Sequence, residues 1–231
     1  MDGFRDASTD LLFETARPSR HDTVLDYACG VGFGALALAV AVRLLEAVDD
    51  RPDAIDEGRR LAAELGLDTV AFRLADLAAL PYPDGAFSLV CCQDALHRLP
   101  DPMRALSEMA RVTSPGGRVV VVDAVVDEGT DAALNELNAL REPAHRRLLS
   151  ADQLTALAAE AGLKLAERRD DRRTVDLEYW LQAAAVPQPR AAEVHRRLRE
   201  MAPTVQERLD LAFADDLISF SYDVLALRLE R

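Results

Sequence analysis

Short apolar runs alternate with helix-like segments along the first half of this 231-residue chain. The apolar runs predict strands at 23–28, 43–48, 69–74, 86–92 and 117–125, and the segments between them predict helices at 32–41, 52–65 and 101–112. Such an order is typical of βαβ units, in which helices cover both faces of a parallel sheet. We therefore expect an α/β fold that forms one domain over residues 1–231.

The last hundred residues follow a different pattern. Ser150 is placed to cap a helix that Gly162 ends, and a strand is expected near 163–169. The segment 174–212 is helical in pattern but is interrupted by three prolines (Pro187, Pro189 and Pro203), and the alternation in 217–229 predicts a final strand. We expect an N-terminal helical cap (1–20), a cofactor-binding core (21–126) and an acceptor-side region (127–231) whose helices at about 174–212 form a lid.

Charge and composition limit the partners that the chain can have. Forty acidic residues against 27 basic ones give a net charge of −13, which disfavours nucleic acid as a partner. The arginines of RRDDRR (168–173) are interleaved with acids and indicate a solvated face or a turn. The longest apolar run, 35–42, is far shorter than the roughly 20 residues of a membrane span, so we expect no membrane segment and a cytoplasmic protein. The cysteines and histidines show no CxxC or HxxxH spacing, which argues against a metal site.

A glycine-rich stretch, VLDYACGVGFGALALA (24–39), joins the first predicted strand to the first predicted helix. Gly30, Gly32 and Ala35 fit the pattern GxGxxA, and Asp49 follows about 20 residues later at the end of the second strand. Glycines at this turn let the backbone approach a ligand bound beyond the carboxyl ends of the strands. The loop predicts a nucleoside cofactor and does not decide which one.

Three further features narrow the choice of cofactor. Asp26 lies inside the end of the first strand, where a dinucleotide-binding strand stays apolar, and its carboxylate suits an ammonium group. Asp76 and Leu77 follow the third strand, with the acid placed to accept from an adenine amine. A proline-glycine turn at 114–123 leads into a buried strand.

The sequence resembles the class I S-adenosylmethionine (SAM)-dependent methyltransferases, and in particular the ubiquinone and menaquinone methyltransferase-like group. Four ordered stretches carry the resemblance: VLDYACGVG, EAVDD, ADLAALPYPDGAFSLV and DALHRLPDPMRALSEMARVTSPGGRVVVVD. They cover 11–123 closely, and the remainder resembles the group loosely through ALREPAHRRLLSADQLTALAAEAGL. The resemblance implies SAM as cofactor and a Rossmann-like sheet of seven strands, mostly parallel, with an antiparallel last strand and a helical lid.

The resemblance also assigns the cofactor site. Asp26, Cys29 and Gly30 would line the methionine portion, Gly32 would let the loop pass under the cofactor, and Asp49 would bind the ribose hydroxyls. Asp76 and the amide of Leu77 would hold adenine. The predicted cofactor-binding residues are Asp26, Ala28, Cys29, Gly30, Gly32, Asp49, Asp50, Asp76, Leu77 and Gln93, with Ala28 standing where many members have glycine. The acids also have structural interpretations: Asp26 as an acceptor for loop amides, Asp49 as a helix cap and Asp76 as a turn former.

Residues for acceptor chemistry are less well defined, because transfer from a sulfonium needs a base only when the acceptor must lose a proton. His97 and His145 follow the fourth and fifth strands and are the base candidates, with a structural role as the alternative for each. Tyr179, Trp180 and Tyr222 are candidates for binding an apolar acceptor, although aromatics at such spacing also serve as core.

The predicted function is methyl transfer from SAM to a small organic acceptor, with a homodimer possible. Three alternatives stay open: a SAM-binding enzyme that catalyses a cyclisation or rearrangement, a nicotinamide-dependent oxidoreductase, and a non-catalytic binding protein. Asp26 and the missing Tyr-xxx-Lys pair disfavour the oxidoreductase.

Overall fold

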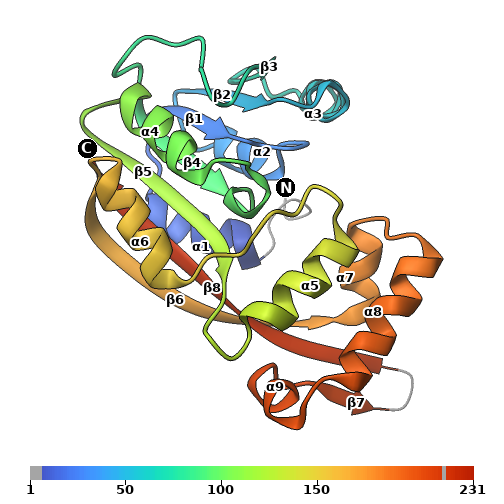
Figure 1. The fold of residues 1–231 in the computed structure, drawn as a ribbon. Coiled ribbons are helices and arrows are strands. Elements are labelled where there is room, and N and C mark those ends of the chain that lie inside the picture. Colours follow the sequence, from blue (N-terminus) through green and yellow to red (C-terminus); the bar gives the residue numbers. More distant parts are fainter. Residues whose placement is uncertain (1–6, 215–216) are drawn as a thin grey trace.

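The computed structural model describes residues 7–214 and 217–231, and its centre is a single mixed sheet (Figure 1). Within these residues eight strands are present, and seven of them follow the order β3-β2-β1-β4-β5-β8-β6. The parallel strands are β1 (Thr23–Tyr27), β2 (Leu44–Asp49), β3 (Val70–Leu74), β4 (Phe87–Gln93) and β5 (Thr113–Val125). The antiparallel strand β8 (Leu217–Glu230) lies between β5 and β6 (Lys164–Asp176), and the short β7 (Ala212–Ala214) pairs with β8. The expected mostly parallel sheet with an antiparallel last strand is confirmed.

Helices cover both faces of this sheet, as predicted. One face packs on α1 (Ala7–Ala16), α2 (Phe33–Ala39) and α3 (Pro52–Leu65), and the other on α4 (Pro102–Val112) and α6 (Ala151–Glu160). Cys91 and Cys92 of β4 belong to the two different cores, which confirms that neighbouring side chains of this strand face opposite sides. A 3₁₀ turn, η2 (Leu96–Arg98), follows β4. Among the described residues no helix has both the length and the apolar character that crossing a bilayer requires.

Local signals in the sequence account for several boundaries. Ser150 and Gln153 form a reciprocal capping box at the start of α6, and Gly66 ends α3 in the left-handed conformation with φ 63°. The valines of β5 at 119–122 are fully buried, because a strand covered on both faces needs apolar side chains on both. Helix α8 (Gln188–Glu200) begins between Pro187 and Pro189, and helix α9 (Pro203–Arg208) begins at Pro203.

The region after β5 departs from the sequence prediction. Strand β6 continues to Asp176, past the end expected near 169, and the helices expected from about 174 begin at Leu177. The extension arises because β6 pairs with β8 from Lys164↔Glu230 to Asp176↔Ser219. Helix α5 (Asp131–Arg141) was not predicted, and α7 (Leu177–Ala183) begins directly after β6.

Helices α5, α7, α8 and α9 gather at one end of the molecule, beyond the parallel strands (Figure 1), and we call them the helical end. This part has a hydrophobic core of its own, in which Leu137, Trp180 and Leu198 pack on Phe220 of β8. It therefore rests on the part of the β6–β8 ribbon that extends past β5.

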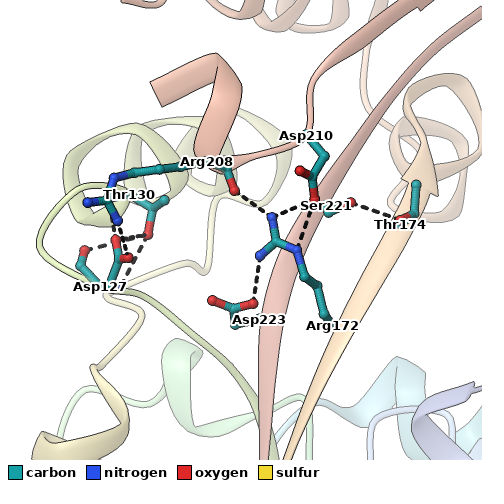
Figure 2. A network of polar contacts seen from close by, with 8 residues as sticks. All are labelled: Asp127, Thr130, Arg172, Thr174, Arg208, Asp210, Ser221 and Asp223. Carbon is teal, nitrogen blue, oxygen red and sulfur yellow. Dashed lines mark hydrogen bonds and ion pairs between the residues drawn. The ribbon is translucent and has the colours of Figure 1, made fainter. Parts of the chain in front are cut away.

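Polar contacts attach α9 to the sheet (Figure 2). The guanidinium of Arg172 in β6 binds Asp210 and Asp223 at 2.8 Å and 2.7 Å and also donates to the carbonyl of Arg208. The side chain of Arg208 in turn reaches Asp127, at 2.6 Å, in the loop between β5 and α5. These ion pairs fix the far edge of the helical end to the ribbon.

Candidate active site

A cavity of about 1020 Å³ lies beyond the carboxyl ends of β1 and β4. The glycine loop, with Asp26 and Gln93, lines one side, and the other side is lined by residues of α5, β6, α7 and β8. This is the edge of an open α/β sheet at which ligands bind.

The glycine loop adopts a left-handed backbone at alternate positions. Ala28, Gly30 and Gly32 have φ values of 55°, 60° and 82°. A glycine at the first of these positions would avoid the roughly 1–2 kcal/mol that a Cβ costs there. Ala28, Cys29 and Gly30 all line the cavity.

Gly32 lies apart from these three. A Cβ on Gly32 would lie 2.3 Å from Cε1 of Phe72, and a Cβ on Gly58 of α3 would meet the same ring at the same distance. The Phe72 ring is therefore held between the glycine loop and α3. The missing side chain of Gly32 makes room for this ring, whereas the predicted role was an approach to the cofactor.

Asp49, at the end of β2, holds the glycine loop through a hydrogen bond to its backbone. Its Oδ2 accepts the amide of Gly30 at 2.7 Å, and its Oδ1 accepts the Nε of Arg51 at 2.9 Å and the amide of Arg51 at 3.1 Å. The carboxylate is almost completely buried, while Arg51 is half-exposed and lines the cavity. Asp49, which was predicted to bind ribose, thus lies beside the cavity and is paired with Arg51.

Asp26 and Gln93 present polar atoms to the cavity next to Gly34. Burial, together with the charge of Asp49, raises the pKa of Asp26 to about 7, although the backbone of Ala35 donates to it. Oε1 of Gln93 is enclosed and has no hydrogen-bond partner among the described residues. A Cβ on Gly34 would lie 3.0 Å from this oxygen. A cationic, hydrogen-bonding group fits here, and the ammonium of the expected cofactor is such a group.

The residues predicted to hold adenine, Asp76 and Leu77, do not belong to the cavity lining. Asp76 is exposed, and its Oδ1 accepts the amide of Ala78 at 2.8 Å, which is the turn-forming alternative. Leu77 is buried, and its carbonyl accepts the hydroxyl of Tyr27 at 2.7 Å. Asp50 is exposed and is absent from the cavity lining.

His97 lies in the cavity lining with both ring nitrogens facing acids. Nδ1 is 2.7 Å from Oδ1 of Asp123, and Nε2 is 3.8 Å from Oε2 of Glu142. Burial lowers the pKa of His97, but the charge and hydrogen bonds of these acids more than offset burial and raise it to about 10. A protonated imidazole has no lone pair, so at neutral pH this ring is placed to act as a cation.

His145 is the second base candidate. Burial and the charge of His97 lower its pKa to about 4, so its ring is neutral near pH 7. Its Nε2 is 2.9 Å from Oδ1 of Asn135, and its ring centroid is 5.7 Å from that of His97. His145 does not belong to the residues that line the cavity.

The three aromatic residues predicted to bind an acceptor all line the cavity: Tyr179, Trp180 and Tyr222. Several polar residues in the lining had not been predicted: Ser8, Arg51, Asp94, Arg98, Arg141 and Arg173. Asp94 directly follows Gln93 at the end of β4, so the strand-end rule could have found it. The others depend on how distant segments meet in the fold.

Comparison with known proteins decides the family. A family model described as a methyltransferase domain matches residues 18–172. The chain belongs to this methyltransferase family. It is a SAM-dependent methyltransferase of the class I fold, which decides against the oxidoreductase and non-catalytic alternatives.

Individual relatives agree with this assignment. The methyltransferase is 28% identical to the uncharacterized methyltransferase YcgJ of Bacillus subtilis (strain 168) over 199 residues, which cover 85% of this chain and 79% of YcgJ. The crystal structure of YcgJ superposes with a TM-score of 0.90 at 26% identity, over 97% of this chain and 98% of YcgJ. A demethylmenaquinone methyltransferase of Thermus thermophilus is 40% identical over 122 residues, 52% of this chain and 53% of that protein. The [4+2]-cyclase SpnF, with a TM-score of 0.69 at 23% identity over 96% of this chain and 80% of SpnF, shares the fold.

Arg51 gives a first testable prediction for the methyltransferase. The guanidinium occupies an acceptor position on Asp49. The prediction that Asp49 binds the ribose hydroxyls of SAM therefore implies that Arg51→Met strengthens SAM binding by about twofold to fivefold at low salt. High salt should narrow the difference by weakening the ion pair in the wild type. Titration calorimetry at two salt concentrations measures both effects. Arg59→Met, which removes an exposed arginine of α3, is the control, and weaker SAM binding by Arg51→Met would mean that Arg51 contacts the cofactor.

Proposed function

We propose that this methyltransferase transfers the methyl group of SAM to a small organic acceptor bound against the helical end. The observation that supports this proposal is the continuity of one cavity from Asp26 and the glycine loop to Trp180 and Tyr222. Its volume of about 1020 Å³ is at the upper end of what single small-molecule sites show, which suits a cofactor and an acceptor together. Apolar side chains around Trp180 favour an acceptor with an apolar part.

We propose that Asp26 binds the ammonium of the cofactor and that Asp49 binds its ribose. SAM supplies an activated methyl group, so holding the acceptor atom in line with the methyl–sulfur bond accounts for much of the rate. Gln93 lies at the end of β4 in the cavity lining and is placed beside the methionine portion.

The state of the two histidines supports a mechanism without a general base, in which the site acts by positioning the acceptor. His97 is held as a cation by Asp123 and Glu142 and has no free lone pair at neutral pH. His145 is neutral but lies outside the cavity lining. We therefore assign His97 a positioning role, in which Asp123 and Glu142 hold its ring fixed in the cavity lining. We expect the proton of a hydroxyl or amine acceptor to leave to solvent.

The experiment that tests the cofactor site is calorimetric titration with SAM, S-adenosylhomocysteine and NADH. The wild type is expected to bind the two sulfur ligands at micromolar concentration and not NADH. Asp49→Ala should weaken SAM binding at least tenfold, because the ribose hydroxyls lose a buried charged acceptor. Asp56→Ala, which removes an exposed carboxylate of α3, should bind as the wild type does, and thermal unfolding verifies that both variants fold.

Either of two results would contradict the proposal. If the folded wild type binds neither SAM nor S-adenosylhomocysteine, the proposed cofactor site is excluded. If Asp49→Ala and Asp56→Ala bind SAM equally well, Asp49 serves only to hold the glycine loop and does not bind ribose. Because the [4+2]-cyclase SpnF shares this fold, SAM binding alone does not identify the reaction, and turnover of SAM is the second measurement. Formation of S-adenosylhomocysteine with a methylated product distinguishes methyl transfer from a rearrangement that consumes no SAM.

A further inference from the structure

Arg141, the last residue of α5, presents an unpaired cation to the acceptor side of the cavity. Its Nε donates to the carbonyl of Trp180 at 3.1 Å, and its guanidinium carbon lies 4.7 Å from the centre of the Trp180 ring. No carboxylate within the described residues forms an ion pair with it, and its two Nη groups have no hydrogen-bond acceptor there. Stacking on the indole fixes the guanidinium plane and leaves its Nη edge available.

The other arginines around the cavity are neutralised by the protein itself. Each of them has a carboxylate within 3.3 Å: Arg51, Arg98, Arg172 and Arg173. His97 is likewise paired with Asp123. Arg141 is thus the one cation in the described lining without an acid of its own. Burial lowers the pKa of Arg141, and the nearby charges of Glu142 and Asp94 oppose this shift without forming an ion pair with it.

The shape and charge of this position define what it would bind. A fixed guanidinium edge matches the two oxygens of a carboxylate, and one uncompensated positive charge matches one negative charge. A phosphate dianion would need a second unpaired cation. Apolar side chains lie beside Arg141, since Trp180 packs edge-on against Phe220 at 5.2 Å between ring centres and Leu134 lines the same cavity.

We infer that the methyl acceptor is a monocarboxylate with an apolar body, whose carboxylate Arg141 binds through its two Nη groups. This inference rests on the proposed function, because it names the acceptor class of the same cavity. The carboxylate in this arrangement is an anchor at the helical end, and the apolar body extends from it along Trp180.

Trp180 is the only tryptophan in the chain, so its fluorescence reports directly on this position. The experiment titrates the protein, saturated with S-adenosylhomocysteine, with matched pairs of probes: hexanoate and hexanamide, decanoate and decanamide, 4-phenylbutyrate and 4-phenylbutyramide. Arg141→Met keeps an unbranched apolar stem and removes the charge, and Arg146→Met removes an exposed charge outside the cavity as the matched control.

The wild type is expected to prefer at least one carboxylate over its amide by about tenfold or more, because a buried charge-assisted pair replaces a neutral contact. Arg141→Met should lose that preference while binding the amide unchanged, and Arg146→Met should keep it. No carboxylate preference in any pair, or an equal preference in Arg141→Met, would overturn the inference. Calorimetry of S-adenosylhomocysteine binding on the same samples separates this outcome from failure of the proposed function, since only the latter abolishes cofactor binding.

Discussion

Replacing Asp26 by asparagine is expected to weaken SAM binding at least 30-fold and, at about pH 8, to stabilise the ligand-free protein. The loss of affinity follows from removing a buried carboxylate that faces the cofactor ammonium, a change worth roughly 2–5 kcal/mol. The gain in stability has a different origin. Burial and Asp49 raise the pKa of Asp26 from 3.8 to about 7, so its charged form is unfavourable in the empty site. Removing that charge is expected to raise the free energy of unfolding by about 2–4 kcal/mol.

The pH dependence gives this prediction a definite sign. A carboxyl group whose pKa is higher in the folded state stabilises the protein while it is protonated. That contribution is fully present below pH 3.8 and is lost as the pH rises through about 7. The stabilising effect of Asp26→Asn should therefore be large at about pH 8 and small at about pH 4, as measured by urea denaturation at both values. Asp56→Asn, in which an exposed carboxylate is neutralised, should show no such difference.

Proton release provides an independent measurement. If the cofactor ammonium ionises Asp26, binding of SAM at about pH 6 should release up to one proton, which calorimetry in buffers of different ionisation enthalpy detects. Asp26→Asn should release none. Wild-type affinity in Asp26→Asn would instead show that Asp26 serves only to accept the backbone of the glycine loop.

Gly32→Ala is the second large expected effect, and it acts on the fold. The left-handed backbone at φ 82° costs a Cβ about 1–2 kcal/mol, and the Phe72 ring 2.3 Å away adds an overpacking cost of about 1–3 kcal/mol. We expect the free energy of unfolding to fall by about 2–5 kcal/mol. For a chain of this size that corresponds to a decrease in Tm of roughly 4–20 °C.

Gly66 offers a matched control for the backbone part. It has φ 63° and no atom within 4 Å of its missing Cβ, so Gly66→Ala should cost only the backbone amount, about 1–2 kcal/mol. Combining Gly32→Ala with Phe72→Leu should recover part of the overpacking cost, which a double-mutant cycle isolates. Equal destabilisation by Gly32→Ala and Gly66→Ala would show that the ring moves freely aside.

Features encoded by neighbouring residues were predictable from the sequence. The alternation of strands and helices from β1 to β5 and the helix cap at Ser150 follow from local patterns, and the structure confirms them. Asp26, Gly30 and Gln93 line the cavity, because a strand pattern also indicates which residues lie at the carboxyl edge of a parallel sheet.

Features that depend on distant segments were not predictable in this way. The residues RRDDRR form the middle of β6. Their side chains are largely solvated, as one of the two interpretations had it, but they form a strand and not a turn. An edge strand needs no apolar face when its side chains are solvated, so its charged alternation hid it. The unpaired state of Arg141 likewise depends on which acids fail to reach it. No spacing in the sequence records such an absence.

The separate core of the helical end has a consequence for how this enzyme could diversify. Leu137, Trp180 and Leu198 pack among themselves and on the projecting ribbon, while the glycine loop, Asp26 and Asp49 rest on the cores of the parallel strands. Substitutions in one core that share no partners with the other combine almost additively. The acceptor pocket can thus change by single substitutions while the SAM site stays intact. One SAM site can therefore serve many different acceptors in the course of evolution.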